Sequence, residues 1–208
     1  MRILDASGEG WLETALAHLR AGGVVALPTE TVYGLAAELD PKAMEGIYAL
    51  KGRSAGKALP WQVDSVERAL DWGFEFSAPA RRLAERFWPG PLTLLLNRPR
   101  RCPAWFAPGA PLVGLRIPHH PVVLELLRVA GEPLAVTSAN RSGQPECLQA
   151  ADVALAFEGA GDLLVLNGST APGGVASTVV DASGPEPQVV REGPIAISEI
   201  LRVWRRGD

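Results

Sequence analysis

Short apolar runs alternate along the chain with segments in which apolar residues recur every three or four positions. The runs predict strands at residues 24–27, 92–96, 113–117, 134–137, 163–166, 178–180 and 188–190. The spaced apolar residues predict helices at residues 12–21, 41–50, 121–129, 150–157 and 198–204. Asp64 and Ser77 are expected to cap two further helices. Because neither a repeat nor a shift in composition interrupts the alternation, it predicts one α/β domain over residues 1–208.

Composition narrows the class of protein. The 208 residues are 47% hydrophobic and 21% charged, as in an ordinary globular protein. A net charge of −3 excludes the broad basic surface of a dedicated nucleic-acid binder. An acidic residue at position 5 comes too early for a signal peptide, and no apolar run reaches membrane-spanning length, so we expect a cytoplasmic protein without membrane contact. Cys102 and Cys147 lie far apart and predict neither a disulfide framework nor a zinc site.

The polar segment 28–35, Pro-Thr-Glu-Thr-Val-Tyr-Gly-Leu, directly follows the predicted strand 24–27. In open α/β sheets, ligands bind at the edge where such strands end. The same residues also fit a turn, in which proline starts the turn and a threonine hydroxyl binds nearby backbone. This segment alone does not decide between a ligand site and a turn.

Similar short polar segments, here called polar islands, lie next to other predicted strands. Residues 138–143 bring hydroxyls and an amide after strand 134–137, and residues 173–178 bring glycines and hydroxyls before strand 178–180. Arg116 lies within an apolar strand, where an unpaired cation is costly, so it needs either a carboxylate partner in the fold or an anionic ligand. Arg191 follows strand 188–190. Together the islands predict a polar cleft for a polyanion and a small polar molecule.

Several known catalytic motifs match the sequence only in part. Residues 52–56 satisfy GxSxG, but a helical pattern precedes them where a serine hydrolase needs a strand. Residues 52–57 resemble a phosphate loop, but the glycines are one residue too close and Ala58 stands where a hydroxyl should bind magnesium. Three histidines without paired ligand spacing predict no metal held by the protein.

The ordered motifs resemble those of the YrdC-like threonylcarbamoyl-AMP synthases. The resemblance rests on residues 28–35, 51–53, 88–93, 115–118, 137–143 and 177–181 and covers nearly the whole chain. It implies a twisted, open mixed sheet flanked by helices, with a concave, positively charged cleft. It also implies synthesis of L-threonylcarbamoyladenylate from L-threonine, bicarbonate and ATP, with release of pyrophosphate. ATP would be a substrate carrying Mg²⁺, and the product would pass to a tRNA threonylcarbamoyl transferase.

The resemblance also implies roles for individual residues. Lys51 and Arg53 resemble triphosphate contacts, with Lys57 as a third, and Ser138, Asn140 and Arg191 resemble residues of the nucleotide site. Thr29, Thr31, Arg116 and Ser177 resemble the threonine and carbamate side, and Lys51, Arg53 and Arg116 are the expected catalytic cations. Ser54 and Ala58 stand where the family pattern has prolines. Two alternatives stay open: an RNA-binding protein of the same fold without synthase activity, binding weakly and with strong salt dependence, and a relative that acts on another carbamoylated substrate.

Overall fold

The computed structural model describes residues 1–54, 58–168 and 170–205. Within them the chain forms a mixed sheet of ten strands in the order β1-β8-β2-β3-β7-β4-β6-β5-β9-β10. The strands are β1 (Arg2–Asp5), β2 (Val24–Leu27), β3 (Gly34–Glu38), β4 (Trp61–Gln62), β5 (Leu92–Asn97), β6 (Leu112–Arg116), β7 (Leu134–Ser138), β8 (Leu163–Asn167), β9 (Thr178–Asp181) and β10 (Gln188–Arg191). The helices are α1 (Trp11–Arg20), α2 (Pro41–Lys51), α3 (Val66–Asp71), α4 (Ala78–Phe87), α5 (Pro121–Ala130), α6 (Ala150–Ala156) and α7 (Ile197–Trp204).

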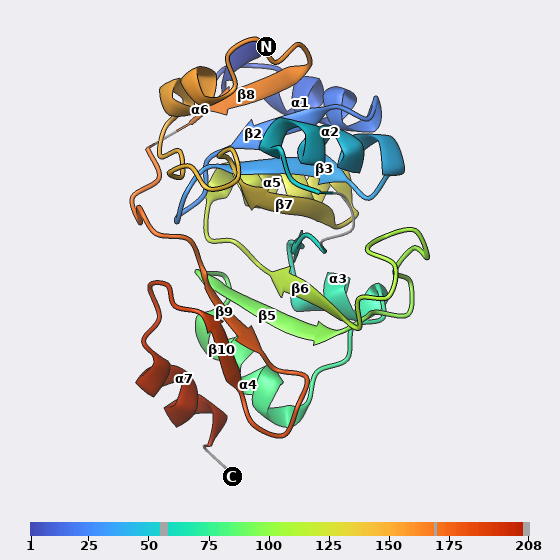
Figure 1. The fold of residues 1–208 in the computed structure, drawn as a ribbon, viewed down its shortest axis with the longest axis vertical. Helices are drawn as coiled ribbons and strands as arrows, with labels where there is room; N and C mark the ends of the chain where they lie inside the picture. Colours follow the sequence, from blue (N-terminus) through green and yellow to red (C-terminus); the bar gives the residue numbers. More distant parts are fainter. Residues whose placement is uncertain (55–57, 169, 206–208) are drawn as a thin grey trace.

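Helices cover both faces of the half of the sheet that contains β1, β8, β2, β3 and β7 (Figure 1). Successive side chains of a strand point to opposite faces, and β2 shows this directly. Val25 and Leu27 pack in the core that includes buried residues of α1 and α5. Val24 and Ala26 pack in the larger core that includes buried residues of α2 and α6. Both faces of β2 are therefore buried, which explains its continuous apolar sequence.

The second half of the sheet contains β4, β6, β5, β9 and β10, with α4 and α7 packed against each other beside it (Figure 1). Arg82 of α4 donates to the carbonyl oxygens of Val203 at 3.3 Å and Trp204 at 2.6 Å. These carbonyls lie at the end of α7, where they have no partner within the helix. The N-terminus and the C-terminal end of the described chain lie at opposite ends of the molecule.

The predicted elements are confirmed, with boundaries that shift by about one residue. Every strand and helix range expected from the apolar pattern appears as an element, and Ser77 caps α4 through its hydroxyl. The prediction that Asp64 caps a helix is wrong. Ser65 is the cap of α3, because its hydroxyl accepts from the Arg68 amide at 3.1 Å, whereas Asp64 forms an ion pair with the Arg68 side chain at 3.4 Å.

Four neighbouring strands place the polar residues together. Gly34, at the start of β3, lies opposite Ser138 at the end of β7. Gln62, at the end of β4, lies opposite Arg116 at the end of β6. Strands β3, β7, β4 and β6 are consecutive in the sheet, and Gln62 lies opposite Leu134 at the start of β7, so the two pairs lie at opposite ends of the short strand β7. No helix among the described residues is long and apolar enough to cross a membrane.

Candidate active site

A cavity of about 230 Å³ lies over these strand ends. Its described lining is Thr29, Thr31, Val32, Tyr33, Gly34, Arg53, Ala58, Pro60, Gln62, Thr93, Arg116, Val136, Thr137, Ser138, Ala176, Ser177 and Arg191. Three arginines are among these residues, and none of them is acidic. The volume is below the roughly 300–1,000 Å³ usual for drug-sized ligands. The enclosed part therefore suits a small anionic molecule, with room for a larger ligand only toward the opening.

The loop before β3 is built around the Thr29 hydroxyl, which is buried. Its oxygen accepts from the amides of Thr31 at 3.1 Å and Val32 at 3.2 Å. The same hydroxyl donates to the Val32 carbonyl at 2.6 Å. A threonine hydroxyl has one proton, so Thr29 has none left for a ligand. The turn interpretation of this segment is thus correct for Thr29, although the loop also lines the cavity.

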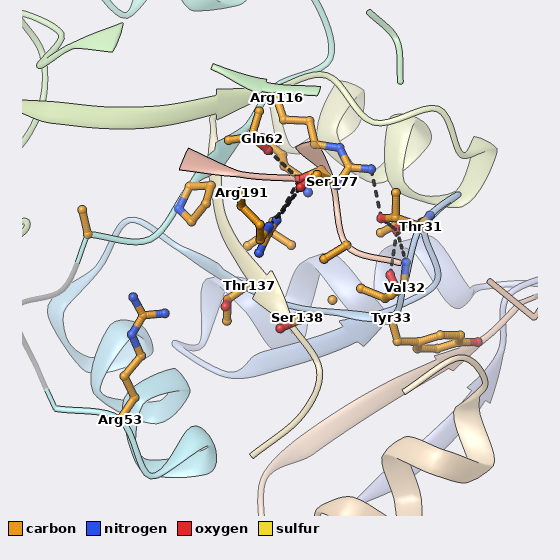
Figure 2. A pocket seen from close by; sticks show the side chains of 17 residues that line it. Thr31, Val32, Tyr33, Arg53, Gln62, Arg116, Thr137, Ser138, Ser177 and Arg191 are labelled. Atoms are coloured by element: carbon orange, nitrogen blue, oxygen red, sulfur yellow. Dashed lines mark hydrogen bonds between the residues drawn. The ribbon is translucent and has the colours of Figure 1, made fainter. Parts of the chain in front are cut away.

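Thr31 faces the cavity, and its hydroxyl contacts two neighbouring side chains (Figure 2). Its hydroxyl lies 2.9 Å from that of Thr29, whose own proton goes to the Val32 carbonyl. The Arg116 guanidinium donates to the Thr31 hydroxyl at 3.1 Å. One lone pair of Thr31 remains. Thr31 can therefore accept a hydrogen bond from a ligand.

Arg116 is buried, with 6% of its surface exposed, and it has the carboxylate partner that the sequence left open. Its guanidinium lies 2.8 Å from the Glu30 carboxylate, and its Nε donates to the Gly90 carbonyl at 3.1 Å. Neither Glu30 oxygen accepts a well-aligned hydrogen bond from the residues that the structure describes, so the pair with Arg116 is held by charge rather than by hydrogen-bond geometry. The guanidinium also lines the cavity, so a partner in the fold does not exclude a ligand.

Hydrogen bonds join Arg191, the last residue of β10, to Ser177, the residue before β9 (Figure 2). Nε and Nη2 of Arg191 donate to the Ser177 carbonyl at 3.0 and 2.8 Å, and Nη2 also reaches the Ser177 hydroxyl at 3.1 Å. The Ser177 hydroxyl lies 2.8 Å from that of Thr93. Burial, together with the charge of Arg116, lowers the pKa of Arg191 from its ordinary value, with Glu146 opposing this. Arg191, expected on the nucleotide side, and Ser177, expected on the threonine side, are therefore in direct contact.

Arg53 extends toward the cavity from just beyond the end of α2 (Figure 2). Among the described residues, none forms a hydrogen bond or ion pair with its guanidinium. This cation therefore differs from Arg116 and Arg191, which are both held by protein acceptors. It is the described arginine of the cavity with most freedom to bind an added anion.

Lys51 and Asn140 lie beside the cavity without lining it. The Lys51 ammonium is buried and donates to the carbonyl of Ser138 at 2.5 Å, the carbonyl of Asn140 at 2.9 Å and the Asn140 side-chain oxygen at 3.0 Å. Burial and the nearby Arg53 lower the Lys51 pKa to about 8. Asn140 also accepts from the Ser138 hydroxyl and donates to the Gln144 carbonyl. In this conformation Lys51 holds the end of β7 and the loop that follows it, and its contact with a triphosphate stays a prediction.

Gln62 and Thr93 are polar lining residues to which the sequence analysis assigned no role. Gln62 is 4% exposed, and its side-chain oxygen is buried without a hydrogen-bond partner among the described residues. Its signal was an amide in the otherwise apolar run 59–63. Thr93 was quoted within a motif without a role. Lys57, the expected third triphosphate contact, lies outside the described residues.

The described residues contain no group of three or more His, Cys, Asp or Glu side chains that could hold a metal ion. The fold and the cavity thus define an α/β protein with a cavity lined by arginines, hydroxyls and an amide. A family model with the description Telomere recombination, that of Sua5, YciO and YrdC, matches residues 17–193. The chain belongs to this family.

Individual relatives agree with this assignment. The threonylcarbamoyl-AMP synthase of Pyrococcus abyssi is 39% identical over 197 residues, which are 94% of this chain and 58% of that protein. A putative threonylcarbamoyl-AMP synthase of Mycobacterium tuberculosis is 35% identical over 193 residues, covering 91% of this chain and 87% of that protein. The structure of Pyrococcus abyssi Sua5 complexed with L-threonine matches with a TM-score of 0.88 at 37% identity, covering 97% of this chain and 60% of that chain. The chain thus spans little more than half of the Pyrococcus relative.

Proposed function

We propose that the protein is a nucleotidyltransferase that forms L-threonylcarbamoyladenylate from L-threonine, bicarbonate and ATP. In this reaction the threonine amine captures bicarbonate as a carbamate, with loss of water. A carbamate oxygen then attacks the α-phosphorus of ATP, and the bond to the β-phosphate oxygen breaks to release pyrophosphate. The reaction needs no protein nucleophile. It depends on positioning the reactants and on stabilising negative charge.

The observation that carries the proposal is the hydrogen-bond polarity of the cavity. Its arginines are donors for carboxylate and phosphate oxygens, whereas Thr31 and the Gln62 oxygen are acceptors with capacity to spare. A ligand that satisfies both must carry anionic groups and N–H or O–H donors close together. A threonine with its carbamate, next to the phosphates of ATP, has this combination. The synthase names of the relatives support the same choice.

Each residue then has a role in this proposal. Arg116 binds the threonine carboxylate or its carbamate while Glu30 balances its charge. Thr31 and Gln62 accept from the threonine hydroxyl and amide. Arg53 and Arg191 bind the phosphates, and Lys51 fixes the end of β7 beside them. Since no described lining residue is acidic, Mg²⁺ would be held by the phosphates of the nucleotide rather than by the protein.

The experiment measures pyrophosphate released from Mg-ATP and bicarbonate with threonine, serine or valine. A site that hydrogen-bonds the hydroxyl rejects valine by a large factor, because valine leaves buried acceptors unpaired. Serine loses one methyl group and is expected to be about 10- to 200-fold poorer than threonine. Equal rates with threonine and valine would remove the threonine assignment. Tight RNA binding at physiological salt without pyrophosphate release would favour the RNA-binding alternative.

Three further expectations belong to the same proposal. The adenylate is passed to a tRNA threonylcarbamoyl transferase, the protein works in the cytoplasm, and any RNA binding is weak and strongly reduced by salt. The last follows from the net charge of −3, which leaves only local basic surfaces for phosphate contacts.

A further inference from the structure

A segment between β8 and β9, residues 171–177, ties the walls of the cavity together, and we call it the glycine strap. At its start the Ala171 amide donates to the Leu148 carbonyl at 2.7 Å. In its middle the Gly174 amide donates to the Thr31 carbonyl at 3.0 Å. At its end Ala176 and Ser177 line the cavity. The strap therefore connects the Thr31 loop to the wall formed by Ser177.

Gly173 is where the strap crosses the Thr31 loop most closely. A Cβ atom at position 173 would lie 2.7 Å from the Glu30 carbonyl oxygen, 3.1 Å from Thr31 Cα and 3.3 Å from the Thr31 carbonyl oxygen. All three atoms belong to the backbone, so a side-chain rotation cannot relieve the contact. Either the strap or the loop would have to move.

The loop is held from its other side, so the two segments cannot separate freely. The Thr29 hydroxyl closes the loop internally, and Arg116 contacts both the Glu30 carboxylate and the Thr31 hydroxyl. The strap is also fixed beyond the crossing, where Arg191 binds the Ser177 carbonyl. An added methyl group at position 173 would therefore change the spacing between the Thr31 and Ser177 walls.

We propose that Gly173 is a positioning residue that sets the distance between Thr31 and Ser177, and so the fit of the amino-acid substrate. The inference rests on the proposed synthase function. Gly173 itself contacts no reacting atom in this proposal. Its effect is transmitted through the backbone of Glu30 and Thr31, and it should act on threonine binding far more than on ATP binding.

The test compares Gly173→Ala with Gly161→Ala in the full chain. Gly161 is the matched control because a Cβ there meets nothing within 4 Å. In the pyrophosphate assay, Gly173→Ala is expected to raise the KM for threonine at least tenfold while the KM for ATP changes less than twofold. Gly161→Ala should match the wild type in both. A threonine KM like that of Gly161→Ala, or equal losses for threonine and ATP, would overturn the positioning role.

A measurement on the wild-type protein keeps the inference testable if Gly173→Ala does not fold. Hydrogen exchange of the Gly174 amide reports the strap directly, because this amide donates to Thr31. Addition of threonine with ATP should slow its exchange at least tenfold, and unchanged exchange would overturn the role. A wild-type protein that forms no adenylate would instead overturn the proposed function, and the positioning role with it.

Discussion

Replacement of Thr31 or Thr29 by valine separates a ligand contact from a structural one. Valine keeps the shape of threonine and removes only the hydroxyl, and both residues are buried, at 1% and 2% exposure. Thr31 uses its hydroxyl on Arg116 and Thr29 and keeps one lone pair for a ligand. Thr29 uses its hydroxyl entirely within the loop. The two substitutions should therefore affect different quantities.

The magnitudes follow from the bonds that each substitution breaks. Thr31→Val removes an acceptor that serves Arg116 and the substrate, and a hydrogen bond involving a charged group contributes about 1.5–3 kcal/mol. Threonine affinity should fall roughly 10- to 150-fold. Thr29→Val leaves two amides and one carbonyl of the loop without a partner, and each such buried group costs about 1–3 kcal/mol. A loss of at least roughly 2 kcal/mol of unfolding free energy is expected.

Calorimetry with threonine in the presence of ATP measures the first effect, and denaturant unfolding measures the second. Thr14→Val is the matched control, because its hydroxyl donates to the Gly10 carbonyl in an exposed turn at the start of α1 and Thr14 does not line the cavity. It should change unfolding by less than about 0.5 kcal/mol and leave binding unchanged. Wild-type threonine affinity in Thr31→Val, or wild-type stability in Thr29→Val, would refute the assigned polarity.

Substitutions of Glu30, Arg53 and Lys51 test the charges around the cavity. Glu30→Gln leaves buried Arg116 without its counter-charge and should cost about 3–5 kcal/mol of stability. Adding Arg116→Met to this variant should largely restore the stability. Additive losses in thermal unfolding would argue against the ion pair. Arg53→Ala should weaken ATP binding roughly 10- to 150-fold without lowering the melting temperature, since no described residue depends on this guanidinium, and unchanged calorimetric affinity would remove Arg53 from the nucleotide site. Lys51 has a pKa of about 8, below the ordinary 10.5, so between these pH values the unfolded chain binds more protons than the folded one. The free energy of unfolding should therefore rise with pH in this window, relative to Lys51→Met. A relative fall across the window would contradict the lowered pKa.

The sequence predicts the strands that are continuous apolar runs but not those that depend on their neighbours. Strand β2 is confirmed at its predicted boundaries because all four residues are β-branched or apolar and buried. Strand β3 was missed because Gly-Leu-Ala-Ala-Glu has low intrinsic preference for strands, and it forms through pairing with β2 and β7 on its two sides. Strand β4 has two residues, too few for any periodic signal.

The site was predictable as a set of polar islands but not as a network. The sequence placed hydroxyls and arginines within or next to strands, and the sheet brings them to one cavity. It could not show that Glu30 rather than a ligand balances Arg116, because these residues are far apart in the chain and meet only through the fold. Nor could it distinguish Thr29 from Thr31, since their roles depend on which acceptor takes each proton.

Isotope tracing of bicarbonate tests the synthase proposal most directly. The wild-type protein is incubated with Mg-ATP, L-threonine and ¹³C-bicarbonate, and the products are followed by mass spectrometry and by pyrophosphate release. The account predicts an adenylate that contains threonine and one ¹³C atom, formed in equal amount with pyrophosphate, and no pyrophosphate when threonine is left out. Pyrophosphate release that does not depend on threonine, or an adenylate without the ¹³C atom, would contradict it.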